Sequence, residues 1–95
     1  MAWATSATAR HILVATEKEC NALKTLIENG ELFENVAAEN SKCPSGRKGG
    51  DLGRFGPGQM VPEFDQAVFG GSVGILYGPI KTQFGYHLLE VTSKG

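Results

Sequence analysis

The sequence has few of the features that mark a membrane, metal-binding or disulfide-stabilised protein. Its 95 residues include two cysteines and two histidines, and its formal net charge is -1. The longest apolar runs are far shorter than the roughly 20 residues that a membrane-spanning helix needs. The first ten residues, MAWATSATAR, contain no basic segment followed by an apolar one, as a secretory signal would. We therefore expect a cytoplasmic chain without an integral membrane segment.

The same scarcity limits the partners and cofactors that the chain is expected to bind. A nearly balanced charge gives no electrostatic reason to expect nucleic acid or an anionic membrane as a partner. Cys20 and Cys43 are too few for a disulfide scaffold and too widely spaced for a zinc site. Counting alone allows one bridge between them, but they belong to different predicted elements. We expect neither a metal nor an organic cofactor.

An apolar fraction of 41% and a charged fraction of 20% are typical of a globular protein, and 95 residues suffice for one domain. Residues 1–8 show little patterning and are predicted to be a loose N-terminus, followed by a single domain over 9–95. The segment 9–14 has the composition of a strand, with His11 and Leu13 on one face. Because both of its faces carry apolar residues, this strand is predicted to be central in a sheet.

Helices and further strands follow this first strand. Thr16 and Glu19 have the spacing of a capping box, and an apolar stripe that includes Cys20 continues until Gly30 ends the predicted helix. A short helix is expected over 33–40, and Pro62 suits the first turn of a third helix. Strands are predicted over 51–55, 80–82 and 86–92, the last two joined by a turn at 83–85. This order of elements predicts an α+β fold with a small, mostly antiparallel sheet.

The segment 41–64 is rich in glycine and too irregular for a long helix or strand. A small domain that contains such a long loop is expected to use it for function. The run GRKGG is not a nucleotide-binding P-loop, because Lys48 is followed by glycine instead of serine or threonine. Arg47 and Lys48 are interpreted as solvated charges, with a bias toward acidic substrates as the alternative.

Several residues of this segment have the chemistry of a site. Cys43 could act as a nucleophile with His11 or His87 as its base, which would suit a thiol hydrolase, or it could be an inert thiol. Each histidine taken alone is more often a core residue than a catalyst. Met60 and Phe64 flank a helix start and could form an apolar slot for a proline ring, which has no N–H to satisfy.

The blocks CPSG-x-x-GGDLG-x-F and GQMVP-x-F, followed by GPIKTQFGYHLLEV, resemble the parvulin family of peptidyl-prolyl cis/trans isomerases. The match covers nearly the whole chain and is to a small single-domain form. The resemblance implies a four-stranded antiparallel sheet surrounded by short α-helices, with the first and last strands in its centre. It also implies an isomerase that accelerates rotation of X–Pro bonds in peptides and folding proteins, without a covalent intermediate.

The resemblance assigns roles to particular positions of this sequence. It implies a hydrogen-bonded histidine pair beneath the site, supported by Thr82, and a cysteine that faces the peptide bond of the substrate. It implies a proline pocket with Gln59 beside it and Phe84 near its rim. The implied catalytic residues are His11, Cys43, Thr82 and His87, and the implied proline-pocket residues are Leu52, Gln59, Met60, Phe64 and Phe84.

Two departures from the family pattern modify these expectations. Phosphate-directed parvulins insert a basic loop after the first strand, whereas here Val14 and Ala15 lead directly to Thr16, so no phosphate requirement is predicted. The segment 71–77 is apolar where many parvulins carry an acidic residue.

The expected partners are proline-containing peptides and partly folded proteins, and the protein is expected to bind them as a monomer. The alternative is a proline-binding or chaperone-like module without turnover.

Overall fold

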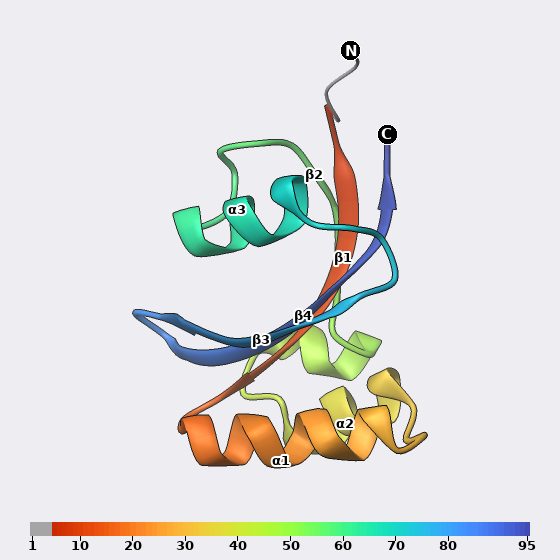
Figure 1. Ribbon diagram of the computed structural model, residues 1–95, viewed down its shortest axis with the longest axis vertical. Helices are drawn as coiled ribbons and strands as arrows, with labels where there is room; N and C mark the ends of the chain where they lie inside the picture. Colours follow the sequence, from red (N-terminus) through yellow and green to blue (C-terminus); the bar gives the residue numbers. More distant parts are fainter. Residues whose placement is uncertain (1–4) are drawn as a thin grey trace.

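The computed structural model describes residues 5–95 and contains a four-stranded antiparallel sheet (Figure 1). Its strands are β1 (Ala7–Val14), β2 (Asp51–Phe55), β3 (Leu76–Thr82) and β4 (Gly85–Lys94), in the spatial order β2-β1-β4-β3. The first and last strands are therefore central, which confirms the sheet that the parvulin resemblance implies. In their register Leu13 pairs with His87 and His11 pairs with Leu89. This register places the two histidines diagonally on one face of the sheet.

The strand β1 begins two residues earlier than predicted. Ala7 and Thr8, assigned from the sequence to a loose N-terminus, pair with both neighbouring strands. Ala7 is fully buried in the cluster that contains Phe55. Small residues such as these give no clear apolar alternation, so the pattern did not predict these first two residues of the strand although their backbone is paired. The prediction for 1–4 lies outside the described residues.

Three α-helices surround the sheet, as the sequence predicts: α1 (Glu17–Glu28), α2 (Phe33–Asn40) and α3 (Pro62–Gly70). A short 3₁₀ helix, η1 (Pro44–Lys48), precedes β2. The amide of Glu19 donates to Thr16 Oγ1 at 3.1 Å, which satisfies one of the free N–H groups at the start of α1. Pro62 occupies the first turn of α3, where its missing N–H leaves no hydrogen bond unmade.

The alternation along the central strands divides the core into two clusters on opposite faces of the sheet. Ile12 and Val14 of β1 pack with Leu88 of β4 against α1 and α2. Ala7 and Ala9 pack with the neighbouring β4 residues against α3. In Figure 1, α3 lies on the other side of the sheet from α1 and α2. The histidines of β1 and β4 share the face that α3 covers, where both imidazoles contact Phe64.

The closing hairpin differs from the prediction at its start. Gly78 and Pro79 were expected to precede the strand, whereas β3 begins at Leu76 and its register shifts between Tyr77 and Ile80. Leu76 pairs with Glu90 and packs against the cluster beneath α1, so both backbone pairing and burial extend the strand. The strand β4 also begins one residue before the prediction and ends at Lys94 instead of residue 92.

One glycine of the loop contacts the central strand directly. The amide of His11 donates to the carbonyl of Gly50 at 2.9 Å, and Gly50 has φ +87°. A Cβ at this position would lie 2.4 Å from the His11 carbonyl oxygen. Only glycine fits both this backbone conformation and this close approach. The contact holds the start of β2 against the backbone of a candidate catalytic residue.

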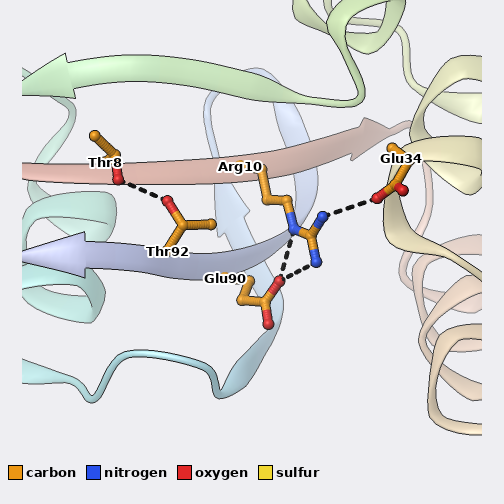
Figure 2. A network of polar contacts seen from close by, with 5 residues as sticks. All are labelled: Thr8, Arg10, Glu34, Glu90 and Thr92. Carbon is orange, nitrogen blue, oxygen red and sulfur yellow. Dashed lines mark hydrogen bonds and ion pairs between the residues drawn. The ribbon is translucent and has the colours of Figure 1, made fainter.

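Arg10 connects three elements on the face opposite the histidines (Figure 2). Its guanidinium contacts Glu90 of β4 at 2.6 Å and Glu34 of α2 at 3.0 Å, and lies 4.5 Å from the centre of the Phe33 ring. The Arg10 and Glu90 side chains are 30% and 20% exposed, so the pair is partly shielded from water. The network therefore joins the start of α2 to the two central strands.

We expect Arg10→Met to lower the free energy of unfolding by about 1–2 kcal/mol, because Glu90 and Glu34 lose their cation and Phe33 loses the guanidinium over its ring. Urea unfolding at neutral pH measures this change. Arg54→Met is the control, since Arg54 is exposed and its change should stay within about 0.5 kcal/mol. Equal midpoints for the two variants would show that the Arg10 network contributes no stability.

Candidate active site

A mostly apolar cavity of about 360 Å³ opens on the face of the sheet that α3 covers. Strands, loop and helix all contribute to its wall. Seven of the nine site residues predicted from the sequence line it: His11, Cys43, Leu52, Met60, Phe64, Phe84 and His87. The fold therefore brings together residues from both ends and the middle of the chain.

The two histidines form a buried hydrogen-bonded pair at this cavity. Their Nδ1 atoms lie 3.2 Å apart, and the rings are stacked with 15° between their planes. His87 Nε2 lies 2.7 Å from Thr82 Oγ1, which also accepts the amide hydrogen of Phe84. One facing Nδ1 must donate and the other must accept, so the pair requires opposite tautomers at these nitrogens. Within residues 5–95, His11 Nε2 has no hydrogen-bond partner.

Burial keeps this pair neutral. It lowers the pKa of His11 from 6.5 to about 4, with a smaller contribution from His87. Burial also lowers the pKa of His87, against an opposing effect of the Glu63 carboxylate. Neutral imidazoles can each donate through one nitrogen and accept through the other, which the chain from Thr82 to His11 requires. At neutral pH the pair is thus a fixed arrangement of dipoles without net charge.

Phe64 of α3 connects the histidines to the apolar wall. Its ring meets both imidazoles edge-on, with centroids 5.4 Å from His11 and 4.6 Å from His87. Phe64 is only 4% exposed and belongs to the cluster beneath α3. These edge-on contacts support the imidazole orientations in which the two histidines hydrogen-bond.

Cys43 is held at the cavity by hydrogen bonds of the residues around it. Ser41 Oγ accepts from the amides of Leu13 and Cys43, and the Lys42 amide donates to the Leu13 carbonyl. Ser45 Oγ donates to Cys43 Sγ at 3.2 Å. Because His11 Nε2 has no partner and the other imidazole nitrogens are engaged, Cys43 lacks the histidine hydrogen bond of an activated nucleophile.

The second cysteine lies on the opposite face of the sheet. Cys20 is fully buried in the cluster beneath α1, and burial raises the pKa of its thiol to about 11. Both cysteines are free thiols. Cys20 is therefore a small apolar core residue, which agrees with its place on the predicted helix stripe.

Two predicted site residues do not line the cavity. Thr82 contacts it indirectly, through its hydrogen bond to His87. Gln59 is exposed, and its side-chain carbonyl accepts the Gly56 amide hydrogen at 2.9 Å, which closes the loop before α3.

Leu13, Lys42 and Pro44 line the cavity without having been predicted as site residues. Leu13 shares a strand face with His11, and the other two flank Cys43 in the sequence. Alternation and adjacency could therefore have identified all three.

The described part of the chain offers no second kind of site for a metal or a membrane. Across residues 5–95, no three histidine, cysteine or acidic side chains are grouped so that they could hold a metal ion. Among α1, α2 and α3, none combines the length and apolar character needed to cross a bilayer.

Comparison with known proteins identifies the family. Residues 5–93 match the family model for the rotamase, or PPIC-type PPIase, domain. The chain belongs to this family, the parvulin-type peptidyl-prolyl isomerases. The family, the sheet order and the apolar cavity above a histidine pair together define a peptidyl-prolyl cis/trans isomerase domain. This confirms the class of enzyme that the sequence resemblance implies.

Individual relatives fall into long and short forms. Foldase protein PrsA of Geobacillus kaustophilus is 47% identical over 87 residues, which are 90% of this chain and 31% of that protein. The crystal structure of peptidylprolyl isomerase PrsA from Bacillus anthracis has a TM-score of 0.93 at 36% identity, covering 98% of this chain and 43% of that one. The parvulin NmPin of Nitrosopumilus maritimus has a TM-score of 0.83 at 37% identity, covering 94% and 97%. The chain spans about a third of the length of the curated relatives it matches.

The lowered histidine pKa values predict a stability that depends on pH. Unfolded histidine binds a proton near pH 6.5 and folded His11 only near pH 4, so the unfolded state gains protons first as the pH falls. The free energy of unfolding should be constant above about pH 7 and fall by about 2 kcal/mol by about pH 5 from His11 alone. Imidazole chemical shifts followed by NMR during a pH titration test the cause directly. A His11 midpoint near its ordinary value would contradict it.

Proposed function

We propose that this domain isomerises unphosphorylated X–Pro bonds without a covalent intermediate, with the proline ring held between Leu52, Met60 and Phe64. The observation that carries this proposal is the mostly apolar cavity of about 360 Å³, whose polar lining residues are Lys42, Cys43 and the neutral histidine pair. A proline ring is a compact apolar group without an N–H, so it fits a slot with few hydrogen-bond donors. A hydrophilic ligand would leave its polar groups unsatisfied against this wall.

The chemistry follows from the nature of the barrier. Rotation about the imide bond is slow because amide resonance is lost as the bond twists, at a cost of roughly 18–20 kcal/mol. An apolar cavity disfavours the planar, dipolar ground state more than the twisted transition state, in which the dipole is smaller. Fixed dipoles of Cys43 and the histidine pair stabilise the twisted carbonyl without reorganising. The rate rises because the transition state is bound more tightly than the planar amide.

The absence of a phosphate requirement is part of the proposal. Only Ala15 and Thr16 separate β1 from α1, so this connection supplies no arginine or lysine to a phosphorylated side chain. The substrates we propose are proline-containing peptides and partly folded proteins, which agrees with the name foldase given to the longer relatives. The monomeric state, the cytoplasmic location and the lack of nucleic-acid binding stay predictions.

NMR exchange spectroscopy on an unphosphorylated Ala-Gln-Pro peptide tests the isomerase and its pocket. A catalytic amount of protein should accelerate cis/trans exchange, and Met60→Ala should reduce this acceleration by about tenfold or more, because the proline ring loses one wall of its slot. Leu32→Ala is the control, since Leu32 is 56% exposed and does not line the cavity. Binding shifts without accelerated exchange would instead support a proline-binding or chaperone-like module.

The same assay tests the role of the thiol. We expect Cys43→Ala to lower the acceleration by about tenfold and not to abolish it, because a thiol is a weak donor and the histidine dipoles remain. Mass spectrometry of the wild-type protein incubated with an activated peptide ester is the companion measurement. An acyl group trapped on Cys43, together with complete loss of function in the variant, would sink the non-covalent mechanism in favour of a hydrolase.

A further inference from the structure

A second cavity, of about 490 Å³, adjoins the proposed proline slot. The two cavities share three lining residues, Lys42, Cys43 and Pro44, so they adjoin along this segment. The additional wall of the second cavity comes from the end of α2, from Ser41 and from η1, which contributes Gly46 and Arg47. A peptide whose proline occupies the first cavity would therefore have a neighbouring residue in the second.

The second cavity is cationic. Both of its charged lining residues, Lys42 and Arg47, are basic, and none is acidic. Neither forms an ion pair with any other residue in the described range 5–95, whereas Arg10 on the opposite face is paired with two glutamates. Glu63, the carboxylate that acts on His87, lines a different cavity that shares no residue with this one.

The fold fixes the backbone of Lys42. Its amide donates to the carbonyl of Leu13 in β1 at 2.8 Å, so its backbone is held beside the central strand. Arg47 lies in η1, which begins directly after Cys43. Lys42 and Arg47 therefore lie on either side of Cys43 along the chain and line the same second cavity. Lys48 of the same loop lines a different cavity, together with Arg10.

We propose that the second cavity receives the residue that precedes proline and selects an acidic side chain there; this inference rests on the proposed function. The rotating carbonyl belongs to the residue before proline, and Cys43 is the group proposed to face that carbonyl. The side chain of this residue therefore lies close to Cys43 and to its neighbours Lys42 and Arg47. A residue after proline is separated from them by the pyrrolidine ring. The substrate class is thus Glu-Pro or Asp-Pro segments of extended peptides.

The preference should be moderate and sensitive to salt. Both cations are exposed, so water and ions screen their attraction for a carboxylate. Two such charges acting on one glutamate should raise kcat/KM for Glu-Pro over Gln-Pro by about three- to tenfold at low ionic strength. The ratio of kcat/KM for Glu-Pro to that for Gln-Pro should approach one at about 0.5 M salt, because the Debye length is then shorter than the width of the cavity.

The test compares kcat/KM for cis/trans exchange in Ala-Glu-Pro, Ala-Gln-Pro and Ala-Lys-Pro peptides, together with a peptide that carries glutamate after proline. The order Glu over Gln over Lys is expected, with no gain from glutamate after proline. In Lys42→Gln/Arg47→Gln the Glu-to-Gln ratio should fall to about one. Lys48→Gln is the matched control, and it should keep the wild-type ratio and the wild-type rate on the Gln-Pro peptide.

Each outcome separates the inference from the proposed function. Equal acceleration of Glu-Pro and Gln-Pro peptides would overturn the inference and leave the isomerase intact. A preference for glutamate after proline would overturn the assignment of the cavity. So would a Glu-to-Gln ratio that falls as far in Lys48→Gln as in Lys42→Gln/Arg47→Gln. A phosphoserine-proline peptide that exceeds Glu-Pro by more than about tenfold would make this a phosphate site and contradict both proposals. Exchange that no peptide accelerates would overturn the proposed function and the inference with it.

Discussion

The antiparallel pairing of β1 with β4 is the constraint on which the rest of the structure depends. It joins the two ends of the described chain in the centre of the sheet and sets His11 and His87 within hydrogen-bond distance on one face. Neither strand carries the pair alone, because the partners are 76 residues apart in the sequence. The pairing also creates the two faces, and thereby separates the cluster beneath α1 and α2 from the site beneath α3.

The site is mostly an extension of the core that α3 covers. Phe64 belongs to that core and orients both imidazoles, while burial keeps them neutral. Polar chemistry is thus embedded in an apolar setting in which a neutral hydrogen-bonded pair is less costly than a charged one. Because burial lowers the pKa of both histidines, the fold becomes less stable as the pH falls.

Much of this arrangement could be predicted from the sequence, because its signals are local. Alternation placed His11 and Leu13 on one face, and the spacing of Thr16 and Glu19 located the start of α1. Spatial strand order came from the family resemblance, since pairing between distant segments leaves no local pattern. The start of β1 at Ala7 and of β3 at Leu76 was missed because backbone pairing fixes both. The adjacency of the two cavities could not be foreseen, because it depends on how η1 packs beside β1.

The central position of the last strand has a consequence for synthesis of the chain on the ribosome. While β4 is still inside the exit tunnel, β1 can pair with β2 alone and β3 has no partner in the sheet. At that stage the histidine pair lacks His87, and the cluster beneath α3 lacks Leu89 and Val91. Pairing between such distant segments carries a loop-closure cost that nearby contacts do not. The proposed site is therefore incomplete until β4 has emerged from the tunnel.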